Sequence, residues 1–261
     1  MSNESVSSTH SAINGKVCLV TGASRTLGAT IARRMAHYGA AVAVNYHQAQ
    51  REAELLCAEL QAAGSNAVAI QADVTDAAQV VRLVTETETQ LGPIEILVNN
   101  VGPYVDTPFL ELPLTDFDRI LNGNVRATFL LTQQVGRLLR TRGAGQIINI
   151  AATDVFHRSH SIYGLAKQGV VHLTEALALE LAPAVRINAI APDLIADNEG
   201  MQPDFVARAV GGTPMGRLVT RAEVAEWVCL LCTPAFAMLT GQTLVLDGGR
   251  SIPRIAQGSA T

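Results

Sequence analysis

Short apolar runs alternate with amphipathic stretches along most of the chain. Several apolar runs lack polar alternation, which is typical of parallel strands that are covered on both faces. Strands are predicted at residues 17–21, 41–45, 67–71, 94–99, 146–151, 185–190 and 243–246. Helices are predicted at residues 29–38, 49–63, 77–91, 116–142, 162–181 and 220–232. This alternation predicts an α/β fold, namely a doubly wound parallel sheet with helices on both faces.

The pattern indicates one domain over residues 15–261. A chain of 261 residues with 48% hydrophobic content can bury a large core, and a sheet of this kind commonly forms a single domain. Residues 1–14 are polar and rich in serine, so we expect a flexible N-terminal tail. Residues 192–216 form an irregular segment that is too long for an ordinary connection. Such loops are often functional lids, and disorder without function is the alternative.

Composition narrows the classes of partner. The net charge of -4 gives no basic field that would attract nucleic acid, and no polybasic cluster suggests a membrane surface. No apolar run approaches the ~20 residues that span a bilayer. The N-terminal stretch lacks an apolar signal-peptide core, and the four cysteines fit a reducing compartment. These features predict a cytoplasmic protein that acts on a small molecule, without nucleic-acid or membrane partners.

The first predicted strand leads into a glycine-containing turn and then into a helix. Gly22 permits a tight turn, and Gly28 lets the start of the helix approach a pyrophosphate. The free N–H groups and the dipole of a helix N-terminus would hold that charge. Strand, glycine turn and helix in this order favour a dinucleotide site over a plain turn.

Tyr163 and Lys167 lie four residues apart in a predicted helix, so they share one face. An isolated tyrosine ionises near pH ~10, and a neighbouring cation stabilises its phenolate. The pairing therefore predicts a phenol of lowered pKa that acts as a general acid. On its own, this spacing would be better explained by a surface tyrosine and a solvated lysine, because the pattern often arises by chance.

Motifs along the whole chain occur in the order found in one enzyme family. They are residues 21–28, Asp73, residues 99–102, Asn124, the Tyr163/Lys167 pair, residues 186–188 before Pro192, and Thr240 and Gly241 leading to residues 247–249. On these motifs the sequence resembles the short-chain dehydrogenase/reductase family from about Gly15 to Gly249. The resemblance implies a single catalytic domain with a Rossmann-type fold, in which residues 192–216 are the substrate loop. It also implies a homodimer or homotetramer that pairs through helices 116–142 and 162–181.

The cofactor is argued from charge. NAD-selective sites carry a carboxylate after the second strand, whereas this chain has no acid there. Arg25 could pair with a 2′-phosphate through its planar guanidinium, although it could also be a solvated loop cation. We therefore predict NADP(H) rather than NAD(H), with dual use left open. The cofactor-binding residues implied by the resemblance are Gly22, Ser24, Arg25, Thr26, Leu27, Gly28, Asn45, Tyr46, His47, Asp73, Val74, Asn100, Val101, Gly102, Tyr163, Lys167, Pro192 and Ile195.

Two matched residues have a second interpretation. Asp73 matches the family residue that hydrogen-bonds the adenine, but it could instead be a helix cap ahead of Asp76. Asn124 resembles the asparagine whose helix distortion holds a water next to the catalytic lysine. Within a helical run, Asn124 could equally be a neutral interior residue.

The catalytic serine of the family is missing. By strand alignment Ala152 takes its position, and an alanine cannot hydrogen-bond a carbonyl. Thr153 offers a hydroxyl but would point to the opposite side of an extended strand, whereas Asp154 returns to the Ala152 side. The pteridine reductase branch of the family is similar in carrying an aspartate where most members have serine. Thr153 and Asp154 are thus alternative candidates for orienting the substrate.

Other departures concern the cofactor turn and the substrate loop. Thr26 replaces a glycine, so its Cβ could shift the phosphate contacts. Asp193 and Asp197 replace a glycine and a threonine, and two acids would favour a cationic substrate unless they are simply solvated. His157 and His160 lack metal-ligand companions, so we predict no metal site.

The catalytic residues implied by the resemblance are Tyr163, Lys167, Asn124, Asp154 and Thr153. They predict NADPH-dependent reduction of a C=O or C=N bond of a small organic substrate, with Tyr163 as the general acid. One alternative is a pteridine or dihydropteridine reductase-like enzyme that uses Asp154. Another is a non-catalytic NADP(H)-binding sensor or structural partner.

Overall fold

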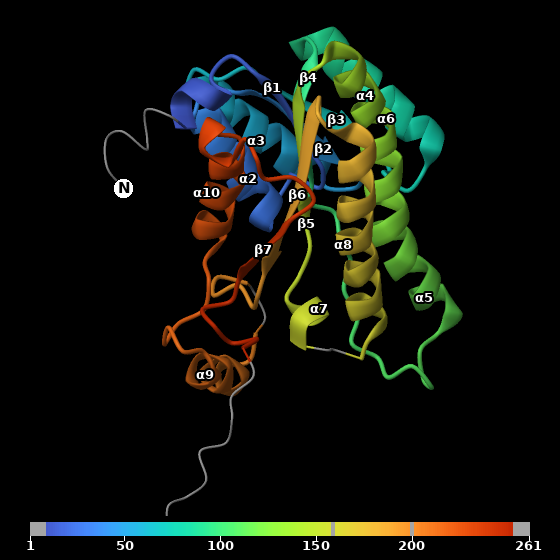
Figure 1. Cartoon of the computed structure of the whole chain (residues 1–261), viewed down its shortest axis with the longest axis vertical. Coiled ribbons are helices and arrows are strands. Elements are labelled where there is room, and N and C mark those ends of the chain that lie inside the picture. The colour runs from blue at the N-terminus through green and yellow to red at the C-terminus, as the bar shows by residue number, and fades with distance from the viewer. Residues whose placement is uncertain (1–8, 158–159, 199–200, 253–261) are drawn as a thin grey trace, which may run out of the picture.

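A computed structural model shows seven strands in one parallel sheet (Figure 1). The structure describes residues 9–157, 160–198 and 201–252. The strands are β1 (Val17–Val20), β2 (Ala41–Tyr46), β3 (Ala67–Gln71), β4 (Ile94–Asn99), β5 (Gly145–Ile150), β6 (Val185–Pro192) and β7 (Thr243–Leu246). Their order is β3-β2-β1-β4-β5-β6-β7, and each neighbouring pair is parallel. The predicted fold class is confirmed.

Helices cover both faces of this sheet. They are α2 (Thr26–His37), α3 (Gln50–Ala62), α4 (Ala77–Leu91), α5 (Leu114–Leu121), the π-helical η1 (Asn122–Arg126), α6 (Ala127–Arg142), α7 (Asp154–His157), α8 (Ile162–Leu181), α9 (Pro203–Gly212), α10 (Arg221–Leu231) and the 3₁₀ turn η2 (Pro234–Phe236). Helices α2, α3 and α10 pack on one face, and α4, α6 and α8 pack on the other (Figure 1).

The sequence of β1 explains why the core has two sides. All of its residues are buried. Because side chains alternate across a strand, Cys18 and Val20 pack in the core under α2 and α10, whereas Val17 and Leu19 pack in the core under α4 and α6. A strand in this position therefore needs an apolar run without polar alternation.

The strand order reverses at β1, whose neighbours are β2 and β4. At such a point the connections leave toward opposite faces of the sheet, so a crevice forms outside the carboxyl ends of the strands. The glycine turn after β1, the segment after β5 and the loop after β6 all lie at this edge. The fold thereby brings together motifs that are far apart in the sequence.

Several predicted boundaries require correction. The predicted helix 116–142 is divided into α5, η1 and α6. The predicted irregular segment 192–216 contains α9, a short helix whose apolar residues Phe205, Val206, Ala209 and Val210 share one face, although only Ala209 is fully buried. Residues 9–13 form a helical turn with Thr9 and Ile13 buried, so the predicted tail does not reach residue 14. Residues 1–8 lie outside the described part of the chain.

Candidate active site

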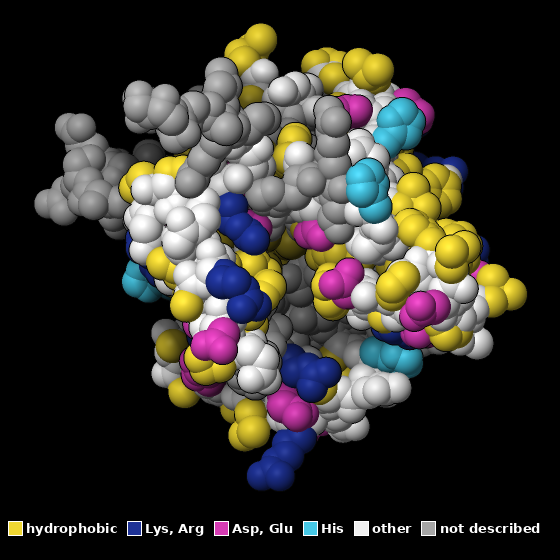
Figure 2. Space-filling view, turned by 90° about the horizontal axis from the view of Figure 1, so that it is seen from below, with side chains coloured by type: hydrophobic (Ala, Val, Ile, Leu, Met, Phe, Trp, Pro, Cys, Tyr) yellow, Lys and Arg dark blue, Asp and Glu magenta, His cyan; other side chains and the backbone are white. Residues whose placement is uncertain are grey.

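A cleft of about 1750 Å³ lies at the carboxyl ends of the strands. Figure 2 shows this end of the molecule, where basic and acidic side chains border a hollow. Gly28, Asn124 and Thr153 lie outside the lining of the cleft. The other predicted site residues line it: Gly22, Ser24, Arg25, Thr26, Leu27, Asn45, Tyr46, His47, Asp73, Val74, Asn100, Val101, Gly102, Asp154, Tyr163, Lys167, Pro192 and Ile195.

The glycine turn has the geometry of an anion cradle. Gly22 has a φ of +58°, which a residue without a Cβ adopts readily. A Cβ at Gly28 would collide with the Gly22 carbonyl oxygen and lie 2.7 Å from the Asn100 side-chain nitrogen. Helix α2 begins without a side-chain cap and without an acid in its first turn. Since Thr26 and Leu27 line the cleft, the uncapped N–H groups suit the pyrophosphate of a dinucleotide.

Thr26 has a backbone conformation that glycine adopts more readily than other residues. Its φ is +50°, a region that is unfavourable for a β-branched residue. Thr26 therefore introduces backbone strain of about 1–2 kcal/mol into the turn.

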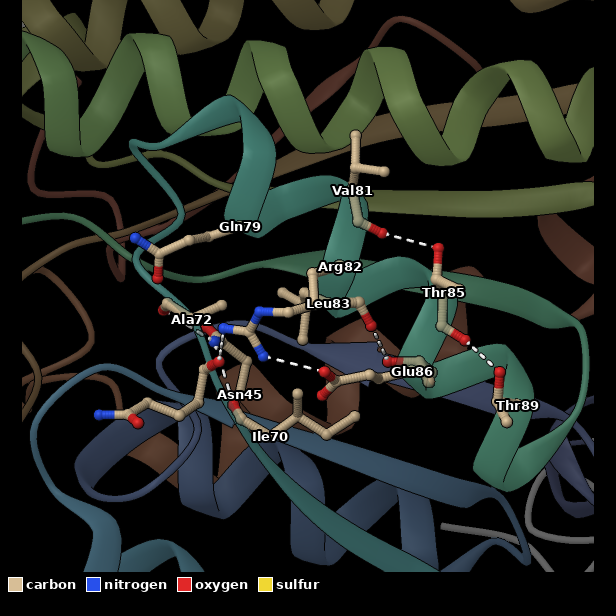
Figure 3. A network of polar contacts seen from close by, with 12 residues as sticks. Asn45, Ile70, Ala72, Gln79, Val81, Arg82, Leu83, Thr85, Glu86 and Thr89 are labelled. Carbon is tan, nitrogen blue, oxygen red and sulfur yellow. Dashed lines mark hydrogen bonds and ion pairs between the residues drawn. The ribbon is translucent and has the colours of Figure 1, made fainter.

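Asn45 supports the turn from β2. Its Oδ1 accepts a hydrogen bond of 3.2 Å from the Gly22 N–H. Its Nδ2 donates to the Ile70 and Ala72 carbonyl oxygens at 3.4 and 3.1 Å (Figure 3). The side chain is 1% exposed, so its amide is used inside the protein. Asn45 thus positions the turn, and its contact with the cofactor stays a prediction.

Asn100 supports the same turn from the end of β4. Its Nδ2 donates to the Thr21 and Gly22 carbonyl oxygens at 3.0 and 3.2 Å. Its N–H donates to the Thr21 hydroxyl at 3.0 Å. The glycine turn is therefore bonded to both strands that flank β1.

Asp73 stabilises the turn after β3 rather than capping a helix. Its Oδ1 accepts from the N–H and the hydroxyl of Thr75 at 2.9 and 2.7 Å. The residue that caps α4 is Asp76, which accepts from the Gln79 N–H. The other oxygen of Asp73 lies 4.0 Å from Nε2 of His47. Asp73 thus presents a fixed carboxylate to the cleft beside an imidazole.

Tyr163 and Lys167 lie on consecutive turns of α8, as their spacing predicts. Ser161 caps this helix, because its hydroxyl accepts from the Gly164 N–H at 3.0 Å. Lys167 is 2% exposed, and its Nζ donates to the Ile150 carbonyl oxygen at 2.7 Å. The same Nζ lies 5.6 Å from the centre of the Tyr163 ring. Helix α8 therefore holds both side chains against the end of β5.

The proton affinities of this pair differ from the sequence-based prediction. Burial raises the pKa of Tyr163, and the Asp154 carboxylate and Tyr104 raise it further. Burial lowers the pKa of Lys167 to about 8, and Asp154 opposes that change. The prediction that Tyr163 has a lowered pKa is therefore wrong, because burial, Asp154 and Tyr104 all raise it. A phenol with a raised pKa stays protonated at neutral pH, which suits a proton donor.

Asn124 lies in the π-helical segment η1, so the helix distortion expected from the resemblance is present. Its Nδ2 donates to the Pro103 and Ile120 carbonyl oxygens, both at 3.0 Å. Its Oδ1 is buried and has no hydrogen-bond partner within the described residues. A Cβ at Gly102 would lie 2.7 Å from this Oδ1 and 2.7 Å from Nζ of Lys167. The absence of a side chain at Gly102 thus leaves room between an orphaned oxygen and the lysine.

The two candidates for the missing serine occupy different environments. Thr153 is 1% exposed, and its hydroxyl donates to Oδ1 of Asp193 at 2.8 Å. Asp154 begins α7 and lines the cleft together with Tyr163. Because β5 ends at Ile150, the extended path assumed for residues 152–154 is replaced by a turn. The geometry therefore favours Asp154 over Thr153 for contact with a substrate.

Tyr104 is a further aromatic side chain at the site. Its ring lies edge-on to the Tyr163 ring, with 4.9 Å between the centroids. Burial raises the pKa of Tyr104 to about 12, and Asp106 and Asp154 also contribute. Tyr104 therefore also remains protonated at neutral pH, and it packs against the candidate acid from the β4 side.

Other lining residues escaped the sequence analysis because no local motif marks them. Glu52 of α3 and Phe205 of α9 are examples. Arg221 also lines the cleft; its N–H donates to Oδ1 of Asp197 at 3.1 Å, and its Nε lies 3.8 Å from Oδ2 of the same residue. Tertiary contacts alone bring these residues to the cleft.

The expectation of a cationic substrate loses much of its support. Asp193 is paired with Arg250 at 2.9 Å, and Asp197 faces Arg221. His160 is exposed, while the side chain of His157 lies outside the described part of the structure. Within the described residues, no group of three or more His, Cys, Asp or Glu side chains could hold a metal ion. No helix in the same part of the chain has the length and apolar character needed to cross a membrane.

Known proteins resemble this chain over most of its length. Residues 22–251 match the protein family described as Enoyl-(Acyl carrier protein) reductase. A 3-oxoacyl-(acyl-carrier-protein) reductase of Synechocystis sp. is 36% identical over 244 residues, which are 91% of this chain and 98% of that protein. A hydroxynaphthalene reductase-like protein Arp2 of Metarhizium robertsii is 32% identical over 256 residues, 91% of this chain and 95% of that protein.

Solved structures show the same fold. A short-chain dehydrogenase/reductase from Serratia marcescens superposes with a TM-score of 0.86 at 33% identity, over 92% of this chain and 99% of that one. A dehydrogenase/reductase from Sinorhizobium meliloti has the same score and identity, over 94% of this chain and 99% of that one.

Proposed function

Because the chain belongs to the short-chain dehydrogenase/reductase family of oxidoreductases, we propose that it reduces the carbonyl group of a small organic substrate with NADPH. The observation that carries this proposal is that the glycine turn, Tyr163 and Lys167 all line one cleft. The names of the relatives, a 3-oxoacyl reductase and a hydroxynaphthalene reductase-like protein, favour a ketone over a pterin as the substrate.

The cleft fits a phosphorylated dinucleotide. The uncapped start of α2 would hold the pyrophosphate, and Arg25 beside it would hold a 2′-phosphate. Asn45 and Tyr46 stand where an NAD-selective site would have a carboxylate, and both are buried. This arrangement supports NADPH over NADH.

The proton would come from Tyr163. The nicotinamide supplies the hydride when it is bound, so the protein must position the ketone and protonate its oxygen. Lys167 would stabilise the phenolate that forms as the proton leaves. The orphaned Oδ1 of Asn124 would hold a water beside Lys167 and so open a path for a replacement proton.

Asp154 would orient the substrate in place of the missing serine. An ionised carboxylate only accepts hydrogen bonds, so it cannot bind the ketone oxygen itself. It can bind a hydroxyl or amine group that lies near the ketone in the same molecule. The proposed substrate is therefore a ketone that also carries a hydrogen-bond donor.

Exposed apolar side chains support the proposed homodimer or homotetramer. Phe129 on α6 and Leu165 and Leu179 on α8 are exposed. These are the two long helices through which pairing is implied by the resemblance, and burying such side chains would favour association.

A substrate panel tests the proposal. The chain is incubated with NADPH or NADH and with 3-oxoacyl thioesters, aromatic ketones, hydroxyketones and aminoketones, and the loss of reduced cofactor is followed by absorbance. We expect NADPH oxidation with at least one ketone, and faster oxidation when the ketone carries a donor group. Equal use of NADH would contradict the cofactor assignment. Tight NADPH binding without turnover on any substrate would instead support the non-catalytic alternative.

Asp154→Asn is expected to lower kcat/KM about 10- to 100-fold for a ketone with a donor group, because the charge-assisted contact is lost. Removing the carboxylate charge also lowers the pKa of Tyr163, since Asp154 helps to raise it. The basic limb of the pH–rate profile should therefore move to lower pH. Asp118→Asn removes an equal charge from an exposed residue outside the lining and should leave this limb in place. Unchanged kinetics in Asp154→Asn would remove Asp154 from the site.

A further inference from the structure

Three chain segments that leave neighbouring strands meet at the side chain of Asp193. Asp193 follows β6, and its side chain is 7% exposed. From the segment after β5, the Thr153 hydroxyl donates to Oδ1 of Asp193 at 2.8 Å. From the segment after β7, Nη1 of Arg250 donates to Oδ1 at 3.0 Å and to Oδ2 at 2.9 Å. One buried carboxylate thus bonds both flanking segments.

We call the contacts among Asp193, Thr153 and Arg250 the junction. Backbone hydrogen bonds also connect the segments that meet there. The Asp193 N–H donates to the Leu246 carbonyl oxygen at 3.1 Å, and the Thr153 N–H donates to the Pro192 carbonyl oxygen at 3.2 Å. These bonds align the chain segments, but they do not constrain the Thr153 side chain. The carboxylate supplies that constraint, and Arg250 compensates for burying its charge.

The bond to Thr153 bears directly on Asp154, which is the next residue. The Phe156 N–H donates to the Thr153 carbonyl oxygen at 2.8 Å, so Thr153 forms the start of the single turn of α7. Such a short helix has little stability of its own and depends on its anchors. Fixing Thr153 therefore fixes the point from which Asp154 extends into the cleft.

We propose that Asp193 is a positioning residue: it ties the C-terminal segment at Arg250 to the start of α7 and thereby holds Asp154 beside Tyr163. The part that concerns Asp154 rests on the proposed function. Asp193 lines the cleft, but its two oxygens accept from Thr153 and Arg250, so its role in the proposal is to hold these two segments rather than to bind the substrate. The Arg250 side chain acts on the site without lining it.

Hydrogen exchange of the full chain tests the junction without any substrate. Thr153→Val and Arg250→Met are each expected to speed exchange about tenfold in the peptide covering residues 151–157. Each variant removes roughly one hydrogen bond, so the free energy of the local opening that exposes these amides to solvent is lower. Arg142→Met is the matched control, because Arg142 makes a comparable pair with Glu88 at 2.7 Å far from the cleft. Unchanged exchange at 151–157 in Thr153→Val would overturn the proposal. If Arg250→Met does not fold, Thr153→Val and Arg250→Lys decide the question.

A double-mutant cycle tests whether Thr153 acts through Asp154. We expect Thr153→Val to lower kcat/KM about tenfold in the natural chain, but less than about twofold in the Asp154→Asn background. The affinity for NADPH, measured by fluorescence, should stay the same in all variants. An equal loss in both backgrounds would show that Thr153 acts independently and would overturn the positioning role. Absence of turnover in the natural chain would refute the proposed function alone, since the exchange measurement still reports on the junction.

Discussion

Replacing Tyr163 with phenylalanine is expected to lower kcat about 10²- to 10⁴-fold, the contribution that general acid catalysis typically makes. The substitution removes only the hydroxyl, so the edge-on contact with the Tyr104 ring is preserved. Because the substitution does not change the glycine turn, the affinity for NADPH should change by less than about threefold. A loss confined to kcat identifies the hydroxyl as a group that acts in the transition state.

Single-turnover reduction and fluorescence titration with NADPH separate these effects. Tyr104→Phe provides the matched control, because it removes the neighbouring phenol from a side chain that is 58% exposed. This variant should keep kcat within about tenfold of the natural chain. Should Tyr163→Phe turn over as fast as Tyr104→Phe, the proton must come from another group and the proposed mechanism fails.

Much of the fold could be predicted because the signals are local. The strands of a parallel sheet that is covered on both faces are largely apolar, and β1 is apolar throughout in the sequence. The glycine turn could be predicted for the same reason, since Gly22 has a positive φ and a Cβ at Gly28 would meet the Gly22 carbonyl oxygen six residues earlier. The sequence contains these constraints because they act on neighbouring residues.

Features that depend on distant contacts could not be predicted in this way. Asn124 follows an ordinary helical pattern, and that pattern does not show the π-helical segment or the bond from the Asn124 side chain to the Pro103 carbonyl oxygen in another loop. Asp193 was expected to be an acid available to a substrate, but Arg250 neutralises it from a segment 57 residues away. No local pattern connects those positions.

The direction of the Tyr163 pKa was predicted incorrectly for a related reason. Spacing along a helix shows that Lys167 is near, but not how deeply both groups are buried. Burial disfavours the charged form of each group, so it raises the pKa of the phenol and lowers that of the ammonium. The degree of burial follows from the packing of α8 on the sheet, which the spacing of two residues does not contain.

Replacing Lys167 with methionine is expected to abolish turnover and yet stabilise the protein at pH 7. Burial lowers the pKa of Lys167 from 10.5 to about 8, so keeping the ammonium charged costs roughly 3 kcal/mol at 1.36 kcal/mol per unit. Methionine occupies similar space without a charge, but the bond to the Ile150 carbonyl is lost, which offsets about 1 kcal/mol. A net gain of about 1–2 kcal/mol in the free energy of unfolding should remain.

The pH dependence gives this prediction a second test. Because the pKa of Lys167 in the folded chain, about 8, lies below the value of 10.5 for the unfolded chain, the folded state binds fewer protons between these two values. The stability of the natural chain, relative to Lys167→Met, should therefore rise between pH ~8 and ~10 and be lowest below pH ~8. Urea unfolding of both proteins across this range measures the difference. A natural chain that is the more stable of the two at pH 7 would show that the buried ammonium is fully compensated by its partners.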